Sequence, residues 1–360
     1  TYMVENLKVH AELSLISDDG LGSEYRISLK SDSLKDTIPE AVADKIKNMP
    51  ETENVYATKY TMGELQISKN EFLSEEEWSD YFKYQNQEPY YIQRYDGICK
   101  QQEDGNYRIK YNVYGYDEAM IEQLRDFILE GEIQPETIKN NNQVIVTANM
   151  DGQGNYFFYG KKPGDTITLR VPKTENYTDE LLKFQSGEEN YIEKEFEIAA
   201  IVNRPLAQEK DFLNTEVWKN AQSVIMTGEQ MEENFGITDY SFINASPADS
   251  ADAKIVSNQL LQVIRDVPKA VLQDYTTAIA TQKGYLGQQQ IFFSSIAVIL
   301  LIISLFHIVN SMSHTILTRR REYGIIRAIG ITDGGFYKMI LQTGILYGLL
   351  ADVFIYLIYN

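Results

Sequence analysis

The sequence predicts an α+β fold, in which a large mixed α/β domain precedes two transmembrane α-helices. Three observations support this prediction. Patterns typical of strands and of amphipathic helices follow one another from Thr1 to Lys283. No charged residue then occurs between Gly284 and Thr318. A second apolar stretch, Phe336–Tyr359, holds only two charged residues, Lys338 and Asp352.

The apolar run Ile291–Asn310 is long enough to cross a hydrocarbon core of roughly 30 Å, so we predict a transmembrane helix over residues 284–312. A second such helix is predicted over residues 336–360, and we expect it to continue past Asn360. Residues 313–335 between them contain the basic run Arg319-Arg320-Arg321.

A short basic segment between two spans is cytosolic by the positive-inside bias. Everything before Tyr285 is therefore predicted to lie outside the cell. We also expect a further transmembrane helix before Thr1, since the chain must reach the outside.

Near the N-terminus, the alternating pattern of Leu7–Ser17 predicts a strand. The sequence Thr37-Ile38-Pro39-Glu40 is typical of a helix start, with Thr37 as the cap and proline in the first turn. The apolar face of that helix is predicted to consist of Val42, Ile46 and Met49. A second strand is predicted over Asn54–Tyr60.

A similar β-α-β unit is predicted at the other end of this domain. Tyr240–Asn244 and Lys269–Tyr275 have strand patterns, and Ala253–Asp266 has a helical one. The apolar face of this helix consists of Val256, Leu260, Val263 and Ile264. Because both ends of the domain are tethered to the membrane, we expect the two units to lie together there.

The middle of the domain, residues 71–235, has its own helices and strands. Helices are predicted to start at Ser74 and after Asp117, the latter ending at Gly131. The inward positions of the second helix are Ile121, Leu124 and Ile128. Strands are predicted over Gln143–Ala148, Thr166–Val171 and Phe196–Val202.

Tyrosine is abundant in residues 81–116. Tyrosine is enriched both in strands and in recognition surfaces. Two interpretations follow, packing within a sheet and a surface for a partner or ligand, and the sequence leaves both open.

The charge of the domain excludes some partners. Five of the 33 basic and three of the 52 acidic residues follow Gly284, which leaves the preceding domain with a charge of about −21. Such an acidic domain repels nucleic acid, so no nucleic-acid partner is expected. Cys99 is the only cysteine, which excludes an internal disulfide and favours a buried thiol.

A search for catalytic motifs gives no candidate, so we expect neither a catalytic site nor a bound metal or cofactor. The three histidines and one cysteine match no familiar zinc spacing. The sequence Gly160–Thr166 has a glycine pattern like a phosphate loop, but Asp165 stands where that loop needs lysine. We interpret it as a turn into a strand.

The first predicted span carries polar residues on one helical face. Ser304, His307, Ser311 and His314 recur at spacings of three and four, and Asn310 lies beside them. Because polar groups are costly in hydrocarbon, this face is expected to contact another helix. Proton relay and substrate contact are the alternatives, and Asp352 poses the same question in the second span.

The segment between the spans has a distinctive motif, Arg319-Arg320-Arg321-Glu322-Tyr323-Gly324-Ile325-Ile326-Arg327-Ala328-Ile329-Gly330. This motif, placed between two spans after a large external domain, resembles the FtsX/MacB-like family of ABC transporter permeases, the type VII ABC systems. Members of this family carry an arginine, glutamate, glycine, arginine, alanine and glycine at this spacing. Asn310 also stands where family members often have an asparagine.

The resemblance implies a division of the chain into domains. Residues 1–70 and 236–283 would form a porter-like subdomain, and residues 71–235 would be inserted between its two parts. The spans at 284–312 and 336–360 would flank a cytosolic coupling loop, 313–335. The apolar sequence around Gly344 and Gly348 looks most like the long Gram-positive permeases, which carry two such modules.

The resemblance also implies a function and partners. The chain would be a permease subunit without catalytic activity of its own, coupling ATP hydrolysis by a separate cytosolic ABC ATPase to movement of its external domain. Family members export peptides, drugs or lipid-linked cargo, or confer antimicrobial resistance. The other expected partners are membrane lipid and a second permease copy or module.

In this reading, one segment contacts the ATPase. The arginines would supply charge complementarity, Ile325 and Ile329 an apolar docking ridge, and Gly324 and Gly330 a close approach or a turn. The coupling residues are Arg319, Arg320, Arg321, Glu322, Gly324, Ile325, Arg327, Ala328, Ile329 and Gly330.

A second function class stays open. The chain would then be a membrane receptor or regulator whose external domain binds an envelope hydrolase or an antimicrobial peptide without transport. An embedded, substrate-sized cavity would favour the transporter, and an exposed aromatic patch would favour the receptor.

Overall fold

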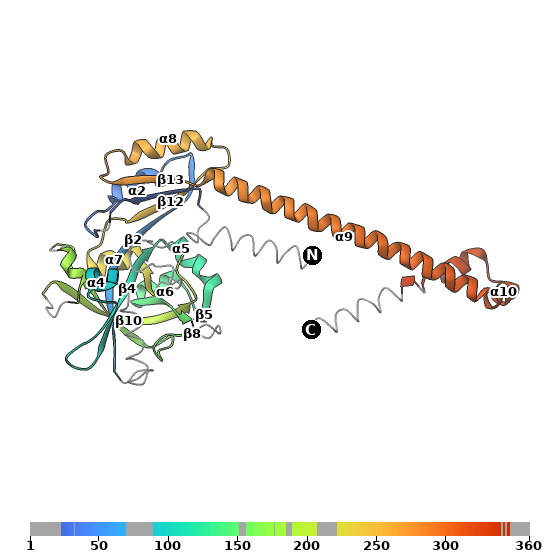
Figure 1. Cartoon of the computed structure of the whole chain (residues 1–360), viewed down its shortest axis with the longest axis horizontal. Coiled ribbons are helices and arrows are strands. Elements are labelled where there is room, and N and C mark those ends of the chain that lie inside the picture. The colour runs from blue at the N-terminus through green and yellow to red at the C-terminus, as the bar shows by residue number, and fades with distance from the viewer. Residues whose placement is uncertain are drawn as a thin grey trace. The chain divides into compact units, whose positions relative to one another are not determined.

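The computed structural model of the chain describes residues 23–31, 33–69, 89–150, 156–175, 177–184, 189–206, 222–339, 341–342 and 344–345. The chain divides into two compact units. We refer to Lys8–Gln282 as the α/β unit, and to Lys283–Asn360 with Thr1–Leu7 as the C-terminal unit. Figure 1 shows that strands and helices are mixed in the α/β unit, which confirms the predicted fold class.

The strands are β1 (Tyr25–Leu29), β2 (Thr52–Ile67), β3 (Cys99–Gln101), β4 (Tyr107–Tyr116), β5 (Ile128–Gly131), β6 (Gln143–Thr147), β7 (Asn149–Met150), β8 (Tyr156–Phe157), β9 (Thr166–Pro172), β10 (Tyr191–Val202), β11 (Ser223–Thr227), β12 (Phe242–Pro247) and β13 (Ala270–Asp274). The helices are α2 (Glu40–Lys47), α4 (Pro89–Tyr95), α5 (Glu118–Gln123), η1 (Leu124–Phe127), α6 (Pro135–Asn140), η2 (Asp179–Leu182), α7 (Gly228–Phe235), α8 (Ala253–Ile264), α9 (Thr276–Thr318) and α10 (Arg320–Ala328).

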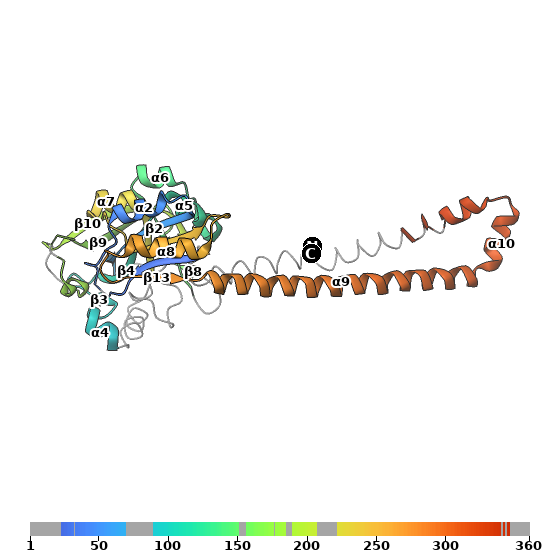
Figure 2. The same cartoon turned by 90° about the horizontal axis from the view of Figure 1, so that it is seen from above.

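The two ends of the α/β unit form one sheet in the order β13-β1-β12-β2, with antiparallel neighbours throughout. Helix α2 connects β1 to β2, and α8 connects β12 to β13, so two split β-α-β units interlock. Figures 1 and 2 show α2 and α8 at the end of the unit that holds β12 and β13. The two predicted β-α-β units therefore lie together, and they share one sheet.

The apolar faces of α2 and α8 form the core of this sheet. Val42 and Ile46 of α2, together with Val256, Leu260 and Ile264 of α8, are buried against side chains of β1, β2 and β12. This confirms the faces that the helical periodicity predicts. Met49 and Val263, also predicted on these faces, pack at the margin of the core and are partly buried.

The start of α2 differs from the predicted capping pattern. The helix begins at Glu40, and its cap position is Pro39, which makes no side-chain cap hydrogen bond. The Thr37 hydroxyl instead donates to Asp239 Oδ2 at 2.8 Å. Thr37 therefore joins two connections that are far apart in the sequence. The predicted strand Leu7–Ser17 and the helix predicted from Ser74 lie outside the described residues.

The remaining strands close a ring of pairings in the order β2-β9-β10-β6-β11-β4, because β4 also pairs with β2. Two of these pairs, β10 with β6 and β11 with β4, are parallel. The strands predicted at Gln143, Thr166 and Phe196 are thus present as β6, β9 and β10. The turn predicted at Gly160–Thr166 is also present, since β9 begins at Thr166.

The helix predicted after Asp117 is shorter than expected. Helix α5 ends at Gln123, a turn of 3₁₀ helix follows, and Ile128 and Gly131 lie in strand β5. Gly131 has φ +91°, and a Cβ there would lie 2.3 Å from the carbonyl oxygen of Ala199. The glycine is thus required for close strand pairing, and the prediction that it ends a helix is wrong.

Five tyrosines of the Tyr-rich segment are buried. Tyr95, Tyr111, Tyr114 and Tyr116 have no exposed surface, and Tyr107 is 5% exposed. The rings of Tyr114 and Tyr116 stack with centroids 5.7 Å apart. For these five residues, packing within the core is the correct interpretation. Tyr81 and Tyr84 lie outside the described residues.

A buried row of charges crosses three strands of the ring. Glu64 of β2 lies opposite Lys110 of β4 and opposite Arg170 of β9. Its carboxylate accepts from Lys110 Nζ at 2.6 Å and from Arg170 Nη1 at 2.9 Å. The Arg170 guanidinium also lies 3.7 Å from the centroid of the Tyr191 ring. Burial lowers the pKa of the Lys110 ammonium, while the nearby Glu64 carboxylate opposes that shift.

We predict that Glu64→Gln strongly destabilises the α/β unit, because it leaves Lys110 and Arg170 buried without their counter-charge. Removing one partner of a buried ion pair costs about 3 to 5 kcal/mol. Urea unfolding of a Thr1–Gln282 fragment, followed by circular dichroism, measures this loss. Glu195→Gln, which removes an exposed carboxylate from β10, is the control and should change stability little. Equal stability of both variants would contradict this account of the charge row.

Candidate functional site

Helix α9 runs without a break from Thr276 to Thr318, and so extends beyond both ends of the predicted span. Its first residue is fixed by Asp274, whose Oδ1 accepts from Thr276 N at 3.0 Å and from Thr276 Oγ1 at 2.6 Å. At a rise of about 1.5 Å per residue, the helix is roughly twice as long as a hydrocarbon core is thick. By length and composition it is able to cross a membrane, and it is one such helix in the described part of the chain.

The residues of the predicted polar face of α9 are exposed in this structure, namely Ser304, His307, Asn310 and Ser311. The Ser304 hydroxyl donates to the carbonyl oxygen of Leu300 at 2.8 Å, which satisfies it within the helix. Asp352 lies outside the described residues. The expectation that this face contacts another helix stays a prediction.

The basic segment after α9 is helical. Helix α10 comprises Arg320–Ala328, and Arg319 is its cap position. The backbone N–H of Tyr323 donates to the carbonyl oxygen of Arg319 at 3.1 Å. The segment between the two spans, which was predicted as a loop, therefore contains a short α-helix.

One face of α10 packs against the helix of residues 333–339. The Tyr323 and Phe336 rings meet edge to face, with centroids 5.4 Å apart. The Arg327 guanidinium lies 5.2 Å from the centroid of the same Phe336 ring and forms an ion pair with Asp333. Ile326 is half-buried on this face. We call this set, Tyr323, Ile326 and Arg327, the inner face of α10.

The opposite side of α10 is exposed. Ile325 is 62% exposed and Ile329 80% exposed, and they are one helical turn apart. Arg321, Gly324 and Ala328 lie beside them and are also exposed. We call Arg321, Gly324, Ile325, Ala328 and Ile329 the outer face of α10. An exposed apolar pair rimmed by arginine is typical of a surface that contacts a partner.

The two glycines of the motif have different roles in the fold. Gly330 has φ +104° and ends α10 in a turn, with its N–H donating to the Arg327 carbonyl at 3.1 Å. Gly324 lies within α10, where a Cβ would have no atom within 4 Å. Gly324 therefore makes no turn, and of the two predicted roles a close approach is the one that remains open for it.

The structure thus brings together part of the predicted coupling set. Arg319, Arg320, Arg321 and Glu322 are exposed at the start of α10, with Ile325, Ala328 and Ile329 on its outer face. Arg327, also predicted to supply docking charge, is 53% exposed, and its guanidinium pairs with Asp333 and lies over the Phe336 ring. The sequence analysis did not predict these contacts of Arg327. Two residues in the sequence could have indicated that the chain folds back here. Gly330 turns the chain after α10, and the Thr332 hydroxyl caps the next helix by accepting from Gly335 N.

Across the residues that the structure describes, no group of three or more histidine, cysteine, aspartate or glutamate side chains is placed to hold a metal ion.

Comparisons with known proteins place the C-terminal part in a family. Residues 294–358 match the family described as FtsX-like permease C-terminal. This match agrees with the resemblance of the motif to the FtsX/MacB-like ABC transporter permeases. The family places the protein in a membrane and implies a cytosolic ATPase partner. No curated protein matches the chain.

Two solved structures are similar to this chain. The periplasmic region of MacB from Actinobacillus actinomycetemcomitans has 9% sequence identity and a TM-score of 0.40, covering 73% of this chain and 94% of that one. The extracellular domain of the noncanonic ABC-type transporter YknZ from Gram-positive bacteria has 9% identity and a TM-score of 0.37, covering 70% of this chain and 100% of that one.

The orientation of the chain can be tested with single cysteines. In intact cells, a cysteine replacing exposed Thr332 should react with a permeant thiol reagent and not with an impermeant one, whereas a cysteine replacing exposed Asp104 should react with both. The native Cys99 gives little background, because it is 1% exposed and burial raises the pKa of its thiol. Reaction of both introduced cysteines with the impermeant reagent would contradict the predicted topology.

Proposed function

We propose that the outer face of α10 docks into a groove of the cytosolic ATPase subunit and that this contact couples ATP hydrolysis to movement of the α/β unit outside the membrane. The observation that carries the proposal is the exposure of Ile325 and Ile329 on a helix whose inner face is already packed. Exposed isoleucines on a rigid helix lose little conformational entropy when they bind.

Charge supports the same assignment. Arg319, Arg320 and Arg321 are adjacent at the start of α10 and are exposed. Together they give this end of the helix a positive field, which would steer a partner with acidic groups around its groove. The same arginines also orient the flanking spans, so the apolar outer face is what distinguishes docking from orientation alone.

The α/β unit leaves both function classes open. It contains a cavity of about 720 Å³, the size of a small-molecule site. Exposed residues such as Lys35 and Glu175 line this cavity, so it is not the embedded cavity that would favour a transporter. Five tyrosines of the Tyr-rich segment are buried and add no aromatic surface, namely Tyr95, Tyr107, Tyr111, Tyr114 and Tyr116. The transporter is proposed because the family match supports it.

The division into subdomains belongs to this proposal as well. A porter-like part from residues 1–70 and 236–283 and an inserted part from residues 71–235 are supported by two hydrophobic cores. One core draws on both chain ends, and the other draws on the closed ring of strands. The cargo class, the Gram-positive origin and a second permease copy or module stay predictions.

Gly324→Trp tests the docking contact. Because Gly324 is exposed and a Cβ there meets no atom within 4 Å among the described residues, the variant should fold and insert normally. In a tight interface the indole would clash, at a cost of about 1 to 3 kcal/mol. We therefore expect the full-length permease to lose co-purification with its ATPase and to lose coupled function.

Gly324→Ala is the matched control. The methyl group is small, and alanine favours the helix over glycine by about 1 kcal/mol, so ATPase binding should persist. If the tryptophan variant binds the ATPase and functions as the wild type does, the segment serves only to orient the spans.

A further inference from the structure

Strand β2 passes from one ladder to the next beside an open cavity of about 720 Å³. β12 pairs with β2 as far as Thr58, and β9 pairs with it from Glu64 onward. Between these points, the strands that the structure describes pair with β2 through β4 alone. Tyr60 and Thr61 of this interval line the cavity, together with the connections β1–α2, β9–β10 and α7–β12. The cavity therefore lies where the pairing with β12 has ended and the pairing with β9 has not begun.

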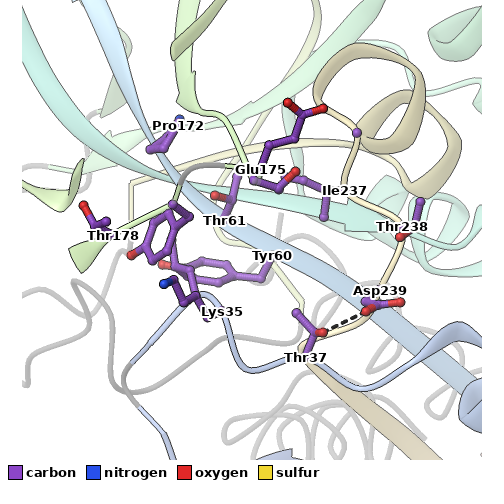
Figure 3. Close-up of a pocket in the computed structure, with 14 residues that line it drawn as sticks. Lys35, Thr37, Tyr60, Thr61, Pro172, Glu175, Thr178, Ile237, Thr238 and Asp239 are labelled. Atoms are coloured by element: carbon purple, nitrogen blue, oxygen red, sulfur yellow. Dashed lines mark hydrogen bonds between the residues drawn. The ribbon is translucent and has the colours of Figure 1, made fainter. Parts of the chain in front are cut away.

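Threonine side chains from four segments of the chain gather at this cavity. Figure 3 shows Thr61 of β2 between Thr178 on one side and Thr37 and Thr238 on the other. The threonines of the lining are Thr37, Thr61, Thr174, Thr178 and Thr238. Because each hydroxyl can both donate and accept a hydrogen bond, this lining suits a ligand with many hydrogen-bonding groups.

One of these hydroxyls is buried without a partner. Thr61 is 5% exposed, and its hydroxyl makes no hydrogen bond among the described residues. A buried hydroxyl without a partner costs free energy, which a ligand group would recover. Because Thr61 lines the cavity, a ligand bound there can supply that partner.

Asp239 supplies a carboxylate of fixed position. It is half-buried at the lining, and the Thr37 hydroxyl donates to its Oδ2 at 2.8 Å. Asp239 forms no ion pair within the described part of the chain, so its carboxylate keeps lone pairs for a ligand. Hydrogen bonds to a carboxylate are stronger than those between neutral groups. Asp239 is therefore the strongest single acceptor that the cavity offers to a ligand hydroxyl.

Carbon surface completes the lining. Tyr60, Pro172 and Ile237 are buried residues that border the cavity. The Tyr60 hydroxyl already donates to Asn112 Oδ1 at 2.8 Å, so Tyr60 offers a ligand its ring carbons. The cavity thus combines several hydroxyls, one fixed carboxylate and an apolar surface.

Several hydroxyl groups on a ring whose C–H faces are apolar occur together in a saccharide. We propose that this cavity binds a neutral saccharide. The Asp239 carboxylate accepts from one ring hydroxyl, the Thr61 hydroxyl bonds to a second, and the apolar surface receives a C–H face. Lys35 and Glu175, exposed at the lining, have opposite charges, so a charged ligand gains little from them.

The test uses the full-length chain in lipid nanodiscs, with binding measured by ligand-observed NMR titration. The saccharide probes are the methyl glycosides of glucose, galactose, mannose and N-acetylglucosamine. Methoxycyclohexane keeps a ring without the hydroxyls, and N-acetyl-trialanine amide is a neutral peptide probe. We expect at least one glycoside to saturate the protein below about 10 mM and to bind more tightly than both other probes.

Two variants locate the site. Asp239→Asn keeps an acceptor for Thr37 but loses the charge, and should weaken glycoside binding about tenfold. Thr61→Val keeps the shape of the side chain and should weaken binding by about two- to tenfold, as expected for one neutral hydrogen bond. Because the Thr61 hydroxyl has no partner in the chain, Thr61→Val should leave the melting temperature without sugar unchanged or raise it. Thr166→Val, an exposed threonine of β9 outside the cavity, is the control and should change neither binding nor stability.

Several results would overturn the proposal. One is the failure of all four glycosides to saturate the wild-type protein below about 10 mM. Equal or tighter binding of methoxycyclohexane would indicate a merely apolar site, and tighter binding of the peptide would assign the cavity to peptides. Unchanged glycoside binding in both cavity variants would place the sugar elsewhere, and a lowered melting temperature of Thr61→Val would give its hydroxyl a structural role. None of these results depends on ATPase docking, so the two proposals fail separately.

Discussion

Strand β2 is the constraint on which the α/β unit depends. Its 16 residues pair with β12 from Thr52 to Thr58 and with β4 from Lys59 to Ile67. The first half thus belongs to the interlocked β-α-β sheet, and the second half to the closed ring of strands. Because one strand carries both ladders, the two cores cannot separate without breaking backbone hydrogen bonds. The cavity lies beside the same strand, at Tyr60 and Thr61.

The charge row strengthens this strand where it enters the ring. Glu64 joins β2 to β4 through Lys110 and to β9 through Arg170. The pairing fixes register, since a shift by one residue would place Glu64 opposite an apolar side chain on the other face. A buried ion pair of this kind specifies one arrangement more than it adds stability. The proposed coupling would require the α/β unit to move as one body.

Sequence patterns predicted the parts of this structure that depend on local periodicity. The faces of α2 and α8 and the motif between the spans were recognisable, because burial at helical spacing needs no knowledge of distant residues. Features that depend on distant partners were missed. Thr37 looked like a helix cap but bonds to Asp239, and Gly131 looked like a helix stop but lies in a strand against Ala199. Nothing local distinguishes these roles.

The predicted coupling segment also has features that the sequence indicated and features that only the structure shows. Its family motif was recognisable, while the separation of α10 into two faces needed the structure. Arg327 illustrates this, since its charge suggested docking and its contacts are with Asp333 and Phe336. In the sequence, α10 lies between α9 and the helix of residues 333–339.

Site-specific photo-crosslinking in the full-length permease tests the central claim most directly. A photoreactive residue in place of Ile325 or Ile329 on the outer face should crosslink to the ATPase subunit, and one in place of Ile326 on the inner face should not. Crosslinks from Ile326 alone, or from none of the three positions in a functional complex, would contradict the claim that the outer face of α10 is the docking surface.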